Sequence, residues 1–472
     1  MILMLVVGGF TSCDAELDQL PFDEFATENA FVSANDFENG IRGVYEALIN
    51  EDIFVSMYSG ADSGTMLSAP DVLSDNVTLS QDGRQTKSTL HAWRYSPQSP
   101  SLSVYSGAYR LIYRANQLLF YAESYDGENK ANIVAEAKAL RALAHFNVVS
   151  FYGKIPTQSG DANASLGVAY VVDADATIEP ARETVGAVYD KIVTDLLEAR
   201  ADINTSNPEN RLNKEGVNLL LSRVYLYMGE WQKSINAANL VTTPVANRAD
   251  VVGVWEDTNK KGVLFYIVNE PGGPLDNSIG VTWSQGSASG LTPEYVSSFE
   301  LTNLYAADDI RKEAYLFDGV ASGNNVNGIK KLFGRTGANN GKVDYKIFRA
   351  AEAKLNIAEA QFNLSNEGPA LIALDAVRSK RYTTPPTGEA GNALRDAIRL
   401  ERRLEFAFEY QRFFDLKRWG VGVIRGNEGD YSNGGGTPSE VLTLPAGSFK
   451  FQLPISQNTM DRNPNLVQNP GY

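Results

Sequence analysis

The chain has 472 residues, 43% of them hydrophobic and 21% charged, and its 42 basic and 57 acidic residues give a net charge of −15. These proportions exclude a collagen-like, disordered or polytopic membrane protein. The negative charge repels phosphate backbones at long range, which argues against a nucleic-acid partner. The length allows either two domains or one large helical domain with elaborate loops, and we favour the second.

The N-terminal residues resemble an export signal followed by a lipidation site. Residues 1–10 (MILMLVVGGF) are almost wholly apolar, yet this run is far shorter than the roughly 20 residues that a transmembrane helix needs. Small residues precede Cys13, as in the lipobox at which bacterial lipoprotein precursors are lipidated and cut. We predict a signal peptide over residues 1–12, lipidation of Cys13 and a flexible acidic leader over residues 13–29.

Two features depart from the lipobox pattern. Phe10 stands where an aliphatic residue is usual, and no basic residue precedes the apolar run. The alternative is a buried cysteine behind an apolar N-terminal strand. Because Cys13 is the only cysteine, the chain can form neither an intrachain disulfide nor a thiolate zinc site. With only two histidines, His91 and His145, we expect no metal and no cofactor.

Apolar residues recur at intervals of three and four in several segments, which predicts helices with one buried face. In chain order we expect these helices at residues 36–49, 104–124, 132–151 and 184–201. The second and third are expected to form an antiparallel pair.

Two later segments predict helical hairpins. Residues 215–241 read as two helices separated by Gly229, with the small Ser222 and Ser234 where the helices approach closely and Tyr225 filling the gap. This pattern resembles a tetratricopeptide unit. Residues 345–378 repeat the spacing in degenerate form, with Ala358 and Ala370 as the small residues and a turn at residues 368–369. A last helix is expected at residues 392–419.

The rest of the chain is irregular. We predict one domain over residues 30–472, whose helical scaffold comprises mainly residues 30–50, 104–245 and 345–420. Long loop regions at residues 51–103 and 246–342, rich in glycine, polar and aromatic residues, are carried on this scaffold.

Four motifs stand out along the chain. One is residues 398–420, with Glu401, Glu405 and Glu409. The other three motifs are residues 135–142 with 145–146 and 152–153; residues 349–352 with 358–360; and residues 453–455 with 463–465 and 468–472. These motifs resemble the SusD/RagB family and follow the order found there, and residues 398–420 are similar to the C-terminal helical signature of that family. With the lipobox-like Cys13, the resemblance spans nearly the whole chain.

The resemblance implies an all-α fold, in which tetratricopeptide-like hairpins form a right-handed superhelical scaffold. It implies a lipoprotein anchored in the outer membrane and facing the cell exterior, with a SusC-like TonB-dependent importer as its partner. The family captures oligosaccharides or peptides, and we favour a glycan ligand because the loops are rich in aromatic and amide side chains.

Glycan sites pair aromatic rings, which contact the C–H face of a sugar, with polar side chains that bind its hydroxyls. Trp93 and Trp283 are our first choices for such rings. The remaining candidates in the two loop regions are Tyr58, Asp75, Asn76, Arg84, His91, Tyr95, Trp255, Tyr266, Asn277 and Tyr295. We assign Trp231 and Trp419 to the core.

The charged helical motifs admit a second interpretation, because a glycosidase also uses paired carboxylates. Glu401, Glu405 and Glu409 lie four residues apart, and Arg402, Arg412 and Arg418 lie three residues from an acidic neighbour, so the charges can pair along the helix. We interpret them as scaffold ion pairs and expect no enzyme activity. Two alternatives stay open, a helical glycoside hydrolase and a purely structural repeat adaptor.

Overall fold

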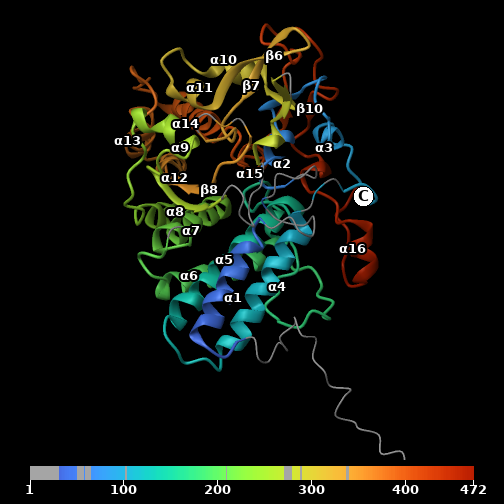
Figure 1. The fold of residues 1–472 in the computed structure, drawn as a ribbon, viewed down its shortest axis with the longest axis vertical. Coiled ribbons are helices and arrows are strands. Elements are labelled where there is room, and N and C mark those ends of the chain that lie inside the picture. The colour runs from blue at the N-terminus through green and yellow to red at the C-terminus, as the bar shows by residue number, and fades with distance from the viewer. Residues whose placement is uncertain are drawn as a thin grey trace, which may run out of the picture.

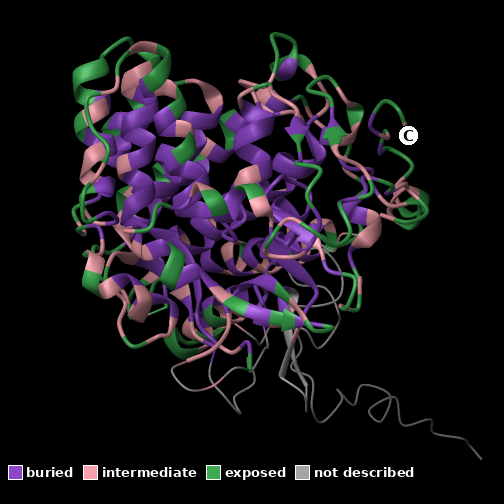
Figure 2. Ribbon diagram, turned by 90° about the horizontal axis from the view of Figure 1, so that it is seen from above, coloured by how far each residue is buried: buried purple, intermediate pink, exposed green. Residues whose placement is uncertain are grey.

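The computed structural model describes residues 31–49, 58, 65–100, 102, 104–208, 210–269, 279–287, 290–335, 338 and 340–472. Helices α1, α4, α5 and α6 occupy one end of the molecule, and strands β6 and β7 with helices α10 and α11 occupy the other (Figure 1). Buried residues fill the interior of the helical body, as the view from above shows (Figure 2). Within the described ranges, no helix is long and apolar enough to cross a membrane. The predicted lipidation site and leader lie outside the described residues.

The scaffold helices lie close to the predicted positions. Their bounds are α1 Ala34–Glu46, α4 Val104–Ala122, α5 Lys130–Tyr152, α6 Val185–Asp202, α7 Lys214–Met228, α8 Trp231–Ala238, α12 Ala350–Asn363, α13 Glu367–Arg378, α14 Gly391–Phe406 and α15 Arg412–Arg418. Five shorter helices are α2 Ala69–Val72, α3 Ser88–His91, α9 Val251–Trp255, α10 Phe299–Leu304 and α11 Ile310–Tyr315, and α16 Gln457–Arg462 lies near the C-terminus.

The hairpin of α7 and α8 has the predicted close approach. The hydroxyls of Ser222 and Ser234 lie 3.2 Å apart, and Ser234 donates a hydrogen bond to the backbone carbonyl of Ser222. Gly229 ends α7 with a φ of 75°, which a residue without a Cβ adopts at little cost. The predicted hairpin and its small residues are therefore confirmed.

The second hairpin, α12 and α13, turns earlier than predicted. The expected turn residues Gly368 and Pro369 lie in the first turn of α13. Proline is favoured there, because the first backbone N–H groups of a helix have no helical acceptor to lose. The hairpins contact each other through Arg223 on α7, which donates two hydrogen bonds of 2.6 Å to the Glu352 carboxylate on α12.

The expected helix over residues 392–419 is wrong in one respect, because it is interrupted between α14 and α15. Phe408 and Tyr410 both have positive φ. Their backbone N–H groups donate to the buried carboxylate of Asp71, and the Lys331 ammonium donates to the carbonyls of Glu405 and Ala407. These side chains satisfy backbone groups that the interrupted helix leaves without helical partners.

The loop regions also contain strands, which the all-α expectation omits. In the described part of the chain they form five two-stranded antiparallel sheets, β1 with β5, β2 with β8, β3 with β4, β6 with β7, and β9 with β10. Their bounds are β1 Val77–Leu79, β2 Val263–Ile267, β3 Ser284–Ser287, β4 Gly290–Pro293, β5 Tyr295–Ser297, β6 Leu316–Ala321, β7 Asn324–Ile329, β8 Tyr345–Arg349, β9 Val423–Ile424 and β10 Thr443–Leu444. The β1–β5 pair joins the two predicted loop regions.

The acidic and basic residues of the motifs form ion pairs, but mostly between elements rather than along one helix. The Glu405 carboxylate accepts hydrogen bonds from Arg349, Arg381 and Arg311. Arg418 does pair with Asp415 on its own helix, at 2.8 Å, but it also pairs with Glu359 on α12. The scaffold role is thus supported, whereas the expected pairing along one helix holds only in part.

We expect the fold to lose stability in acid. Burial alone would raise the pKa of Glu405, but the charges of Arg381, Arg349 and Arg311 hold it well below its ordinary value, and the pKa of Glu359 and of Asp415 is also lowered. Such groups stabilise the fold fully above the ordinary carboxyl pKa of about 4, and this stabilisation is lost as pH falls through the lower folded values. The thermal midpoint, followed by circular dichroism, should therefore fall steeply below about pH 4. A midpoint that stays constant to about pH 2.5 would contradict this.

Candidate functional site

The aromatic residues predicted to face a glycan lie inside the protein. Trp93 is 5% exposed and Trp283 1% exposed. The same holds for the other loop aromatics except Tyr266, since Tyr58, Tyr95, Trp255 and Tyr295 are all buried. The expectation that Trp93 and Trp283 present open ring faces is therefore wrong.

The β1–β5 pairing explains this burial, because it draws the two loop regions into one core. The Trp283 ring lies edge-on to Tyr295, which lies edge-on to His91. Trp93 donates its indole N–H to the carbonyl of Leu73, and the Arg425 guanidinium lies 4.0 Å from its ring centre. The candidate residues that we selected from the sequence do lie close together, but they lie in the interior of the protein.

The polar candidates are occupied by structural contacts. The Asp75 carboxylate accepts two 2.8 Å hydrogen bonds from Arg412 and pairs with Arg403 at 3.2 Å. Asn76 donates to Asp71, and Arg84 lies 3.3 Å from the Glu294 carboxylate. The Tyr266 ring, half-buried, lies 5.0 Å from the Lys260 ammonium. Asn277 lies outside the described residues.

A groove beside α4 has the features that the loop residues lack. Its volume is about 460 Å³, and Tyr105, Tyr109 and Tyr113 line it from one face of α4. These residues are spaced by four, so their side chains stack along the helix. The rings of Tyr105 and Tyr109 lie 4.8 Å apart, and Tyr113 is 40% exposed. A row of partly open aromatic rings therefore forms the floor.

One wall of the groove is the extended segment of residues 167–180, here called the strap. Side chains of α4 hold it by its backbone. The Tyr109 hydroxyl donates to the carbonyl of Ala169, and the Asn116 amide donates to the carbonyls of Val171 and Asp173. Since the strap has little regular structure of its own, these bonds fix its distance from the tyrosines.

Helix α5 holds the strap from behind. Arg141 makes a two-pronged ion pair with Asp195, at 2.7 and 2.8 Å, and Asp195 also accepts the hydroxyl hydrogen of Tyr170 on the strap. The His145 ring stacks on Tyr170 at 3.9 Å, and its Nε2 accepts the backbone N–H of Val171. Burial lowers the pKa of His145 to about 3, so the ring is neutral and can accept this hydrogen bond. His145 is thus a buried imidazole whose two nitrogens serve the fold.

A second wall is the C-terminal segment with α16. Asn463 and Asn465 donate side-chain hydrogen bonds to the carbonyls of Pro180 and Glu179. Arg182 donates to the carbonyls of Gly167 and Val467 and to the side chain of Asn469, which ties both walls together. Residues from two of the four motifs, 135–142 with 145–146 and 463–465 with 468–472, thus hold the walls of the groove in place.

The rim of the groove carries hydrogen-bonding groups of both kinds. Asp173 and Asp175 on the strap and Asn458 and Arg462 on α16 are exposed. Burial raises the pKa of Tyr105 and Tyr109 above the ordinary value, so both hydroxyls stay protonated at neutral pH. Aromatic faces flanked by carboxylate, amide and guanidinium groups suit a sugar ring, whose C–H face is apolar and whose edge carries hydroxyls.

The sequence contained a signal for this groove that the loop-based interpretation missed. The buried face of α4 includes Ala108, Ile112 and Ala115, and the three tyrosines lie beside that face rather than on it. Neighbouring elements cover only one side of a side chain at the edge of a helix's buried face, so a row of tyrosines at that edge is partly exposed. The strap and the C-terminal wall could not be predicted in the same way, because their residues lie about 60 and more than 300 positions from α4 in the sequence.

Comparisons with known proteins agree with this architecture. Residues 275–472 match the model of the SusD family, and residues 36–226 match a model described as "Starch-binding associating with outer membrane". SusD-like protein P2 of Formosa agariphila is 25% identical, with 100% of this chain and 98% of that protein covered. SusD-like protein P25 of the same organism is 22% identical, with 100% and 99% covered.

Solved structures show the same fold. A SusD superfamily protein from Bacteroides thetaiotaomicron superposes with a TM-score of 0.80 at 23% identity, covering 93% of this chain and 100% of that chain. Surface glycan-binding protein A from Bacteroides fluxus superposes with a TM-score of 0.72 at 18% identity, covering 93% and 100%. The molecule is therefore a protein built on helical hairpins, with the SusD superfamily fold.

The family follows from the two models, which match the N-terminal and C-terminal parts of the chain in turn. The chain belongs to the SusD/RagB family.

Proposed function

We propose that this protein binds a glycan at the surface of the outer membrane and delivers it to a SusC-like TonB-dependent importer. The observation that carries the proposal is the α4 groove, in which three tyrosines in a row face exposed carboxylate, amide and guanidinium groups. The names of the relatives support it, since one similar structure is a surface glycan-binding protein and one matching family model is described as starch-binding.

The proposal places the protein on the outer membrane, facing the exterior, with the lipid of Cys13 as its anchor. The description of the matching model as associating with the outer membrane supports this location. An anchored binding protein beside an importer raises the local concentration of the glycan at the importer. Mass spectrometry of the membrane-extracted protein tests the anchor, because it should find an acylated Cys13 as the first residue.

We propose binding without cleavage. A glycosidase needs one carboxyl group to donate a proton and a second to act as nucleophile or base. Glu405 is 0% exposed and accepts hydrogen bonds from three arginines, while Glu409 accepts from Arg349 and Lys331. Glu401 is 1% exposed and pairs with Arg311 at 2.7 Å. None of the three glutamates of the C-terminal motif is therefore available to a substrate, so incubation with the bound glycan should release no reducing ends.

Replacing Tyr113 by alanine should weaken glycan binding. The change removes an exposed ring at the surface, so the loss of affinity should be about five- to thirtyfold, equivalent to about 1–2 kcal/mol of contact free energy. Isothermal titration against a panel of oligosaccharides and peptides, with wild type and Tyr113→Ala, measures it. Phe120→Ala is the matched control, since this ring lies on the same helix, is 57% exposed and does not line the groove.

The panel also separates the proposal from peptide binding. If only peptides bind and Tyr113→Ala weakens them, the groove stands but the glycan assignment is wrong. If glycans bind with equal affinity to wild type and Tyr113→Ala, the groove is not the binding site.

A further inference from the structure

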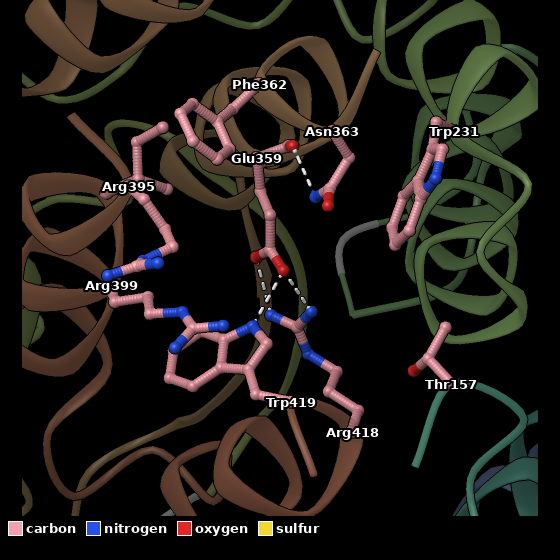
Figure 3. Close-up of a pocket in the computed structure, with 10 residues that line it drawn as sticks. Thr157, Trp231, Glu359, Phe362, Asn363, Arg395, Arg399, Arg418 and Trp419 are labelled. Carbon is pink, nitrogen blue, oxygen red and sulfur yellow. Dashed lines mark hydrogen bonds and ion pairs between the residues drawn. The ribbon is translucent and has the colours of Figure 1, made fainter. Parts of the chain in front are cut away.

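A second pocket lies away from the groove, where α8, α12, α14 and α15 meet. Its volume is about 210 Å³, and it is lined by two tryptophans, a phenylalanine and three arginines (Figure 3). Trp231 and Trp419, which we expected in the core, are only half-buried and line this pocket. The assignment of both rings to the core is therefore wrong.

The carboxylate in this pocket is already satisfied. Glu359 accepts hydrogen bonds from the Arg418 guanidinium and, at 2.7 Å, from the indole N–H of Trp419 (Figure 3). Burial alone would raise the pKa of Glu359, but the charges of Arg418 and Arg402 outweigh it and hold the pKa below its ordinary value. Glu359 is thus an anion whose charge is balanced by Arg418.

Arg399 is a further cation in the pocket, beside the Arg418–Glu359 ion pair. Its guanidinium lies 4.7 Å from the ring centre of Trp419, and no carboxylate among the described residues forms an ion pair with it. Arg395, one helical turn earlier, is paired only with exposed neighbours, Asp396 and Asn392. Arg395 and Arg399 lie four residues apart on α14, so their like charges lie close together. The pocket therefore carries positive charge in a protein whose net charge is −15.

Trp231 supplies an apolar surface beside this charge. It begins α8, packs against Leu226, Ile235 and Ala360, and borders the pocket. In Figure 3 the Trp231 ring faces the cavity from the side opposite Arg395 and Arg399. An isolated inorganic anion would not use this aromatic surface, whereas an anionic ring would use both the surface and the charge.

We propose that this pocket is a second binding site, for a carboxylate-bearing sugar unit such as a hexuronate. The carboxylate would pair with the Arg399 guanidinium, and the sugar ring would lie against Trp231. A cavity of about 210 Å³ suits one ring rather than a chain. The choice of a sugar over another ring-bearing carboxylate rests on the proposed function, but the pocket is separate from the α4 groove.

Tryptophan-selective ¹⁵N labelling tests the site, because the chain has five tryptophans and so gives five indole signals. Titration with galacturonate should shift the signals of Trp231 and Trp419, and Trp231→Phe identifies one of them by its loss. The neutral methyl ester of galacturonate should bind about ten- to a hundredfold more weakly, because it lacks the charge that pairs with Arg399.

Arg399→Gln should weaken galacturonate binding by a similar factor, whereas Arg42→Gln, an arginine on α1 outside the pocket, should leave it unchanged. Absence of indole shifts with galacturonate would overturn the site. Equal shifts with acetate would overturn the sugar assignment. Tyr113→Ala should not change the titration, so a failure of the groove and a failure of this pocket are distinguishable.

Discussion

Replacing Glu405 by glutamine should lower the free energy of unfolding by about 3–5 kcal/mol, because it leaves the buried Arg381 guanidinium without its carboxylate and removes one carboxylate from Arg349 and Arg311. Arg381 donates to Glu405 through two nitrogens at 2.8 Å, and Arg349 donates to it at 2.8 Å. All three side chains are at most 8% exposed, so water cannot replace the lost charge. Urea unfolding followed by circular dichroism measures the change.

The control for this prediction is Glu440→Gln. Glu440 pairs with Arg94 at 2.6 Å, but both side chains are more than half exposed. Exposed pairs contribute at most about 1 kcal/mol, so this variant should unfold close to wild type. Equal effects of the two substitutions would show that the buried network does not hold the C-terminal helices in place.

The second large effect is expected from Arg141→Met. The change leaves Asp195 buried without its cation, which should cost about 3–5 kcal/mol of stability. Asp195 also accepts the hydroxyl of Tyr170 on the strap, so the wall of the groove should loosen and glycan affinity should fall together with stability. Urea unfolding and isothermal titration, the latter at a temperature where the variant is folded, measure the two effects.

Lys138→Met is the matched control, since Lys138 lies one turn earlier on α5 and pairs with the exposed Glu198 at 2.7 Å. It should change stability by less than about 1 kcal/mol and leave binding unchanged. If Arg141→Met lost stability yet bound glycan with wild-type affinity, the strap would not be part of the site.

The sequence predicted the scaffold well because helical burial is a local property. The spacing of apolar residues in α4, α5, α6 and α7 depends only on the sequence of each helix, and each helix was expected within a few positions of its bounds. The interruption at Phe408 and Tyr410 has a distant cause. It depends on Asp71 and Lys331, which lie more than 70 residues away in the chain, so no local pattern contains it.

The candidate site was predicted less well for the same reason. Trp93 and Trp283 lie in segments without helical period, and their exposure depends on the β1–β5 pairing between segments about 200 residues apart. By contrast, Trp231 and Trp419 lie in segments that were expected to be helical, but they lie at helix ends, where a ring can face a pocket. Periodicity identifies the buried face of a helix but not the surroundings of its ends.

The central claim is that the α4 groove binds a glycan and leaves it intact. The most direct measurement is a crystal structure of the protein soaked with an oligosaccharide selected from the titration panel. The claim predicts an uncut oligosaccharide with one ring against Tyr113 or Tyr109 and its hydroxyls near Asp173 or Asn458. An oligosaccharide on another face, or cleaved products in the groove, would contradict it.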